Sequence, residues 1–140
     1  MVYVDTSIIV AYYCPESLSE RAEAFLTAQA RPAISSLTEV EFFSALARKV
    51  REGGMARNAA VRISSQFLGH LQGHFYSYLP VERRHYTLAR EWLGLFSTRL
   101  RTLDSLHVAV ASSEGLPLST ADRNLYESAR YLHIEAALLE

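Results

Sequence analysis

The segment VYVDTSIIV, residues Val2–Val10, decides the fold prediction. Its apolar residues predict a short buried strand that runs directly into a helix, and Pro15 ends that helix. Asp5 stands inside this apolar segment, at the place where the strand should end. Because an ionised carboxylate without a partner is costly to bury, we expect Asp5 to emerge at the edge of the sheet where ligands bind.

Strands and helices are predicted to alternate along the rest of the chain. Further strands are expected at Pro32–Ser35, Phe75–Val81, Leu116–Thr120 and, as an edge strand, Tyr131–Glu135. Helices are expected at Ser17–Ala30, Leu37–Glu52, Ala56–His70, Glu82–Phe96, Leu103–Ser113 and Asp122–Arg130. This alternation predicts a three-layer α/β/α sandwich with a central, mainly parallel sheet of four to five strands. No linker or repeat interrupts the pattern, so residues 1–140 are expected to form one domain.

Composition points to a protein that acts in the cytoplasm. The formal net charge of −1 indicates no general affinity for nucleic acid or membranes. Cys14 is the only cysteine, which excludes an intrachain disulfide and is typical of intracellular proteins. The longest apolar run, Ile8–Cys14, is much shorter than the about 20 residues that span a bilayer. No basic region precedes it, as a secretory signal would require.

Three further acids occupy places related to that of Asp5. Asp122 follows the predicted strand Leu116–Thr120, while Glu41 and Asp104 lie near the starts of helices. Ligands of parallel sheets bind beyond the carboxyl ends of the strands, so the four acids are expected to meet there. Carboxylates this close raise one another's pKa unless cations neutralise them. Oxygen ligands without a nearby cysteine select Mg²⁺ or Mn²⁺, and the cluster therefore predicts metal-assisted hydrolysis of a phosphodiester.

Ordinary structural roles also explain some of these acids. Asp122 is suited to cap the helix that follows it. Thr102 can cap the next-to-last helix, which leaves Asp104 in the favourable first turn. Asp5 is different, because an acid at an apolar strand–helix junction has no routine structural task.

Glu41 has two structural interpretations of its own. It lies three residues after Thr38, which is the spacing of a capping box. Ser36 and Glu39 have the same spacing closer to the strand end, however, and can fill that role and leave Glu41 free. A solvated stripe on the helix surface explains Glu41 equally well.

At these residues the chain resembles the PIN-domain ribonucleases, most closely the VapC-type toxins of prokaryotic toxin–antitoxin pairs. Three blocks carry the resemblance and together extend over nearly the whole chain: VYVDTSII, AISSLTEVEFFSAL and LRTLDSLHVAVASSEGLPLSTADRNL. The last block is the most specific, because it combines an acid-led helix, a strand and a Thr-x-Asp turn.

The resemblance implies a set of functional residues. The metal-binding and catalytic acids are Asp5, Glu41, Asp104 and Asp122, and the supporting hydroxyl residues are Thr6 or Ser7 and Thr120. Many relatives carry a further acid where this chain has Asn124. An amide oxygen can still bind a hard cation or its water, but we expect a second metal ion to be held more weakly.

The resemblance also implies a reaction and partners. The expected reaction is Mg²⁺- or Mn²⁺-dependent cleavage of RNA by a metal-activated water, which leaves a 5′-phosphate. The expected partners are an identical subunit in a homodimer and a small cognate antitoxin that blocks the site.

Neighbouring basic and histidine residues extend the hypothesis. Arginines flank the acids in sequence and are candidate contacts for RNA phosphates, with solvated surface charges as the alternative: Arg48, Arg51, Arg99 and Arg101. His107 lies three residues after Asp104 on the same predicted helical face. A mixed Asp/His metal site is one interpretation, but a histidine in LHVAVA is more typical of a core residue satisfied by hydrogen bonds.

Two other functions compete with a PIN-domain nuclease. A haloacid-dehalogenase-like phosphatase requires a second acid two residues after Asp5, where this chain has Ser7. A catalytically inactive PIN-like module that only binds RNA or protein is the other alternative, and the four intact acids argue against it. The sequence argues against nucleotide hydrolysis through a phosphate loop, because no glycine-rich loop ends in Gly-Lys-Ser/Thr.

Overall fold

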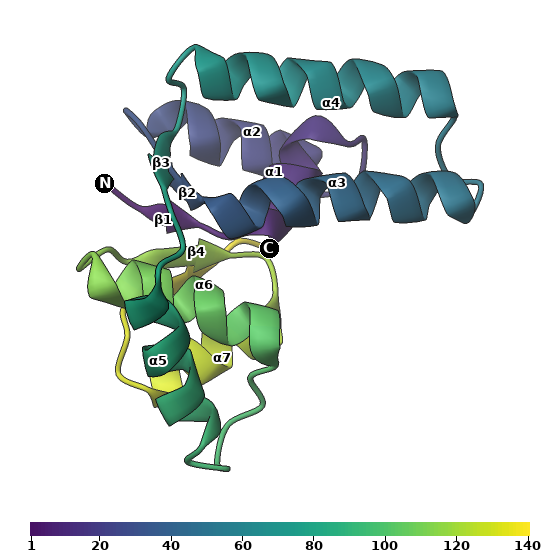
Figure 1. Ribbon diagram of the computed structural model, residues 1–140. Coiled ribbons are helices and arrows are strands. Elements are labelled where there is room, and N and C mark those ends of the chain that lie inside the picture. Colours follow the sequence, from purple (N-terminus) through teal and green to yellow (C-terminus); the bar gives the residue numbers. More distant parts are fainter.

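A parallel sheet of five short strands forms the centre of the computed structural model, which describes residues 1–140 (Figure 1). The strands are β1 (Tyr3–Val4), β2 (Ala33–Ser35), β3 (Ser77–Leu79), β4 (Leu118–Thr120) and β5 (Ala136–Leu138). Their order across the sheet is β3-β2-β1-β4-β5, and every neighbouring pair is parallel. The carboxyl ends of all five strands therefore lie along one edge of the sheet.

Helices cover both faces of this sheet, as Figure 1 shows. One layer contains α1 (Thr6–Tyr13), α2 (Ser19–Ala28), α3 (Ser36–Arg51) and α4 (Arg57–Gln72). The other contains α5 (Arg83–Leu93), α6 (Thr102–Ser113) and α7 (Arg123–Tyr131). The predicted three-layer α/β/α sandwich with a parallel sheet is confirmed. None of the seven helices has the length and apolar character needed to cross a membrane.

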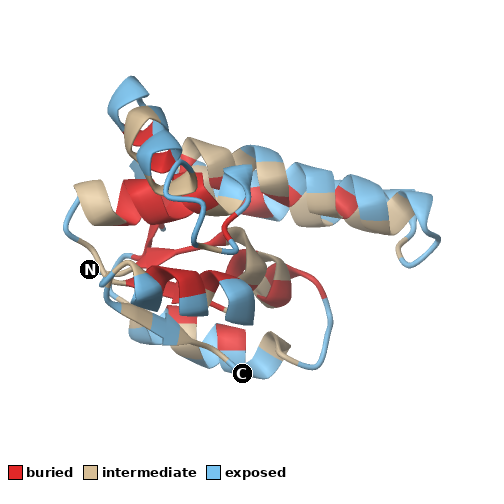
Figure 2. Cartoon of the chain, turned by 90° about the horizontal axis from the view of Figure 1, so that it is seen from below, coloured by how far each residue is buried: buried red, intermediate tan, exposed pale blue.

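Alternation along the strands builds one core on each face of the sheet. Val4 packs with Ile8 and Phe42 in the layer of α1 to α4, whereas Tyr3 packs with Val108 in the layer of α6 and α7. This follows from the opposite directions of successive strand side chains. Buried residues gather where the layers meet, while the outer end of the α3–α4 hairpin is exposed (Figure 2).

Helix α6 is the most deeply enclosed helix. Its residues Ser105–Ala111 are all buried, so both faces of the helix are covered. The two ends of the helix reach the surface: the first turn, which carries Asp104, and the last two residues, Ser112 and Ser113. Tight packing of this kind fixes the side chains that α6 presents to the sheet.

The last strand lies further along the chain than the sequence predicts. The segment Tyr131–Glu135, expected as the edge strand, instead holds the end of α7 and a turn, and β5 begins at Ala136. The turn closes the helix, because the Ile134 N–H donates to the Ala129 carbonyl at 2.9 Å and His133 has a φ of 60°. The predicted edge position of this last strand is confirmed.

Candidate active site

An open cavity of about 850 Å³ lies at the carboxyl ends of β1 and β4. Its polar wall includes side chains from two helices and one turn: Thr6, Ser7, Glu41, Arg48 and Asp122. The cavity thus collects side chains that are far apart in the sequence, and Thr6 and Asp122 alone are 116 positions apart. This is the edge at which the sequence predicts the acids to meet.

Asp5 follows β1 directly and is almost completely buried, with only 5% of its surface exposed. The Ser7 hydroxyl donates to its Oδ1 at 2.5 Å and in turn accepts from the Ala121 N–H at 2.9 Å. Burial raises the pKa of the Asp5 carboxyl to about 6, although the charge of His107 and the Ser7 hydrogen bond oppose this. Asp5 therefore lies at the predicted edge of the sheet, where β1 ends. The expectation that its side chain emerges there is wrong, because the side chain is buried.

The turn between β4 and α7 holds Asp122. The Asp122 N–H donates to Thr120 Oγ1 at 2.9 Å. The Asp122 Oδ1 accepts from the backbone N–H groups of Asn124 at 2.8 Å and Leu125 at 3.3 Å, so this acid caps α7. Capping uses one carboxylate oxygen only, and the residue also lines the cavity. The structural and the functional interpretation of Asp122 are therefore compatible.

Glu41 extends from the second turn of α3 into the cavity. Its Oε1 accepts from the Thr6 hydroxyl at 2.6 Å and also bonds to His107 Nε2. Its side chain is 22% exposed, and burial alone would raise its pKa. The hydrogen bond and charge of His107, together with the Thr6 bond, outweigh burial and lower the pKa of Glu41.

The start of α3 leaves Glu41 free of any capping role. The capping box joins Ser35 and Thr38, not Ser36 and Glu39 as predicted. The reason is that β2 runs into α3 without a loop, so Ser35 itself becomes the N-cap. The Thr38 side chain then accepts from the Ser35 N–H at the N-terminus of α3, and Glu41 lies about one turn further along the helix.

Asp104 lies in the first turn of α6, as predicted, and is half-buried. The helix begins one residue earlier than expected, so Thr102 is inside it, Arg101 is the N-cap, and the predicted Thr102 cap is wrong. Burial and then the negative charge of Asp122 raise the pKa of Asp104, and the charge of Glu41 adds to this. Acids from α3, from α6 and from the turn before α7 therefore share one electrostatic environment.

The donor chemistry of this region suits a hard cation. Carboxylates and hydroxyls are the ligands that Mg²⁺ and Mn²⁺ prefer, and a nearby cation would relieve the raised pKa values of Asp5 and Asp104. No three His, Cys, Asp or Glu side chains stand within metal-binding reach of one another, however. Coordination by three of these acids therefore requires their side chains to rotate.

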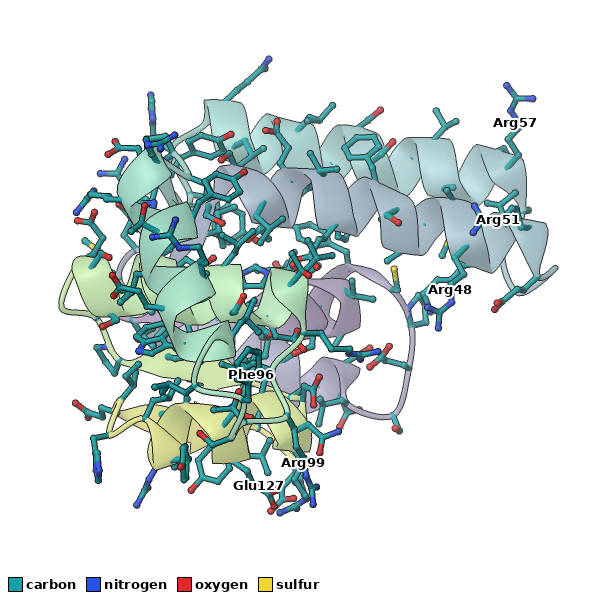
Figure 3. All side chains as sticks on the ribbon, turned by 60° about the horizontal axis from the view of Figure 1, so that its bottom comes forward. Arg48, Arg51, Arg57, Phe96, Arg99 and Glu127 are labelled. Carbon is teal, nitrogen blue, oxygen red and sulfur yellow. The ribbon has the colours of Figure 1, made fainter.

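The four candidate arginines are exposed and lie on two separate elements. Arg48 lines the cavity and pairs with Glu52 at 3.5 Å, with 71% of its side chain exposed. Figure 3 shows Arg48 and Arg51 on the outer half of α3, and Arg99 on the loop before α6. The charge of Arg101 lowers the pKa of Asp104, which places this arginine close to the acids. Arg48 therefore borders the cavity, and Arg101 acts on one of the acids.

His107 is the main residue whose role sequence reasoning missed. It is a buried histidine satisfied by hydrogen bonds, as predicted, with 2% exposure and Nδ1 2.6 Å from the Tyr3 hydroxyl. Its second partner is Glu41, which connects the core to the acids. No local sequence pattern predicts this contact, because the two residues are 66 positions apart.

The last residues of the chain also line the cavity, which the sequence did not suggest. Leu139 donates its N–H to the Thr120 carbonyl at 2.8 Å, so the chain continues along the end of β4. Leu139 and Glu140 thereby reach the cavity wall beside Asp122.

Comparison with solved structures finds the same fold in toxin–antitoxin proteins. A sarcin–ricin loop cleaving toxin, VapC20 of Mycobacterium tuberculosis, is 19% identical with a TM-score of 0.72, over 89% of this chain and 92% of that one. A promoter DNA-bound VapBC2 structure from Rickettsia felis is 16% identical with a TM-score of 0.68, over 100% of both chains. A DNA-bound VapBC structure from Salmonella typhimurium is 21% identical with a TM-score of 0.66, also over 100% of both chains.

The comparison of sequences agrees with this likeness. No curated protein matches the chain significantly. The model of the PIN domain family matches residues 2–131, which include all four predicted acids and confirm the resemblance noted in the sequence. This chain therefore belongs to the PIN domain family.

Proposed function

We propose that this protein is a Mg²⁺- or Mn²⁺-dependent endoribonuclease, built as one PIN domain over residues 1–140, and the toxin of a VapBC-type toxin–antitoxin pair. The observation that carries the proposal is electrostatic. The pKa values of Asp5 and Asp104 are raised at the same edge of the sheet, and Asp104 is raised partly by the charge of Asp122. Acids held at such a cost are typical of sites that bind cations.

Each acid has a role in this proposal. Asp5 and Asp104 would bind the first metal ion, and Glu41 and Asp122 would complete its surroundings or orient the attacking water, with Asn124 in support. A divalent ion bound there lowers the pKa of a water molecule and stabilises negative charge on the phosphoryl group. The hydroxyls nearby hold the carboxylates in place: Thr6 on Glu41, and Ser7 on Asp5. Thr120 supports the turn that carries Asp122.

The substrate is RNA that enters the open cavity. Hydrolysis adds water across the phosphodiester, breaks the bond from phosphorus to the 3′ oxygen, and leaves a 5′-phosphate and a 3′-hydroxyl. The acids repel phosphate before a cation binds, so exposed arginines are needed at the rim. Arg48 and Arg101 are the proposed first contacts, with Arg51 and Arg99 further along α3 and the loop before α6 (Figure 3).

An antitoxin and a second subunit are the proposed protein partners. Solved VapBC structures with the same fold contain the toxin together with its antitoxin and DNA. In this chain the α3–α4 hairpin exposes apolar side chains that a partner would cover: Val40, Phe43, Val61 and Leu68. We propose that the pair acts in the cytoplasm, where the RNA substrate is found.

A catalytically inactive PIN-like module is the second candidate. One observation favours it, because no three potential ligands stand within metal-binding reach of one another. Such a module would bind RNA or protein through the same cavity and rim without cleaving it.

One experiment separates the two candidates. Purified protein is incubated with structured and unstructured RNAs, with EDTA, Mg²⁺ or Mn²⁺, beside Asp5→Asn and the matched control Glu16→Gln, an exposed acid of the same cavity. The nuclease proposal expects metal-dependent cleavage that Asp5→Asn abolishes and Glu16→Gln retains. RNA binding without cleavage under all conditions would establish the inactive module, and cleavage that survives Asp5→Asn would refute the assigned site.

A further inference from the structure

A continuous chain of buried polar contacts connects the sheet to one of the proposed catalytic acids. It runs from Ser35 on β2 through Tyr3 on β1 to His107 on α6, and from there to Glu41 on α3. The Tyr3 hydroxyl lies 2.8 Å from Ser35 Oγ and 2.6 Å from His107 Nδ1. His107 Nε2 then bonds to Glu41 Oε1, and Thr6 bonds to the same oxygen. Three of these residues, Tyr3, Ser35 and His107, are at most 2% exposed.

Counting protons fixes the direction of these bonds. The Tyr3 hydroxyl donates its one proton to Ser35 Oγ. The Tyr3 oxygen must then accept from His107 Nδ1–H. On the other side, His107 Nε2 bonds to Glu41 Oε1, and a carboxylate oxygen accepts, so Nε2 donates. His107 therefore bonds to Glu41 through one ring nitrogen, while Tyr3 on the sheet holds the other nitrogen.

The two carboxylate oxygens of Glu41 have different surroundings. Oε1 accepts from both Thr6 and His107, whereas Oε2 takes part in neither bond. The carboxylate also lines the cavity. Holding one oxygen on two donors fixes the rotation of the carboxylate and leaves the other oxygen for a cation or a water molecule.

We propose that His107 is a positioning residue for the nuclease reaction: it holds Glu41 by one oxygen, and Tyr3 and Ser35 hold the imidazole in the orientation that this requires. The inference rests on the proposed function. It extends that function by adding a residue that acts through Glu41, while the set of proposed metal-binding acids stays the same. His107 is buried, so in this proposal it acts through Glu41. Its charge also lowers the pKa values of Asp5 and Asp104, so it lies within electrostatic reach of three of the four acids.

A purely structural role for His107 makes different predictions, and a double-mutant cycle separates them. The variants are His107→Asn, Glu41→Gln and the pair combined, with His107→Gln as a rescue, because glutamine can still reach Glu41 with an N–H donor. His85→Asn is the matched control, since His85 is an equally buried histidine on α5. The two readouts are kcat and KM for RNA cleavage, and Mn²⁺ affinity of the RNA-free protein by calorimetry.

The positioning role expects His107→Asn to lower kcat and Mn²⁺ affinity by about 10- to 100-fold, with KM changed less than about twofold. In the Glu41→Gln background the same substitution should change kcat and Mn²⁺ affinity by less than about twofold, because the carboxylate it positions is gone. His107→Gln should recover most of both losses, and His85→Asn should leave kcat of the folded protein unchanged. Equal losses with and without Glu41, or no loss at all, would overturn the inference.

A second variant covers the case in which His107→Asn does not fold. Tyr3→Phe removes one oxygen atom and keeps the packing of β1, so it tests the support of the imidazole alone. It should lower kcat by about 3- to 10-fold in the Glu41 protein, an order-of-magnitude expectation for an indirect contact. It should have no effect on kcat in the Glu41→Gln background, and an effect there would overturn the inference. Wild-type protein that neither binds Mn²⁺ nor cleaves RNA would instead refute the proposed function itself, and the positioning role with it.

Discussion

Asp5→Asn should stabilise the metal-free protein at neutral pH and at the same time abolish RNA cleavage. Asp5 is nearly fully buried, and its pKa is raised from 3.8 to about 6. An acid whose folded pKa lies above its unfolded pKa opposes folding once the pH exceeds the unfolded value. The penalty grows between the two pKa values and is complete above the folded one. Asparagine removes the charge, and its Oδ1 can still accept from Ser7.

The size of the effect follows from the two pKa values. A difference of about 2 pKa units at about 1.4 kcal/mol each gives a gain of ~3 kcal/mol in the free energy of unfolding at pH 8. The same calculation gives ~1.5 kcal/mol at pH 5, because the folded carboxyl is already largely protonated there. A gain that rises with pH is the signature of a buried charge, and improved packing would give the same gain at both values.

Urea unfolding in EDTA at pH 5 and pH 8 measures both values, with Glu16→Gln as the exposed control that should show no gain. Adding Mn²⁺ should then raise the stability of the wild-type protein by about 2.7 kcal/mol at 100 times Kd and leave Asp5→Asn nearly unaffected. Loss of stability in Asp5→Asn at pH 8, or a gain independent of pH, would refute the argument that Asp5 is buried at a cost.

Three further predictions concern other parts of the molecule. Replacing Arg48 and Arg99 together with alanine should weaken RNA binding and reduce the slope of log affinity against log salt by about 1 to 2; an unchanged slope in a filter-binding titration would exclude both as phosphate contacts. Burial and the charge of Arg84 lower the pKa of His85, so its neutral form stabilises the fold above its unfolded pKa of about 6.5, and that stability is lost as the pH falls below it. The melting temperature measured from pH 7 to pH 5 should therefore fall less in His85→Gln than in wild type, and parallel curves would contradict this. Phe42→Ala should cost about 3–5 kcal/mol in denaturant unfolding, because the Phe42 ring is fully buried and packs 4.5 Å from that of Phe67; a loss below about 1 kcal/mol would show that the core readily refills.

The layers of the fold were predictable because each element carries its own local pattern. Short apolar segments such as Pro32–Ser35 predict strands, and the paired glycines Gly53 and Gly54 predict the end of α3. The position of the last strand was not predictable from YLHIE, because its apolar residues belong to the end of α7 and to the turn that closes it.

The site was predictable to a similar extent. The strand-end rule brought Asp5 and Asp122 to the same edge of the sheet. It could not show that Asp5 is buried there, or that Glu41 bonds to His107, because both depend on how α6 packs against the sheet and α3. Contacts between residues so distant in sequence depend on how the helices and strands pack, and local sequence periodicity cannot predict them.

The course of the last residues has a practical consequence for anyone who prepares this protein. Leu139 and Glu140 line the cavity, and Leu139 is fixed to Thr120 at the end of β4. An affinity tag fused after Glu140 would start at the cavity mouth and obstruct whatever enters it. Met1 lies before β1, at the opposite edge of the sheet, and is 70% exposed, so a tag fused there leaves the mouth open.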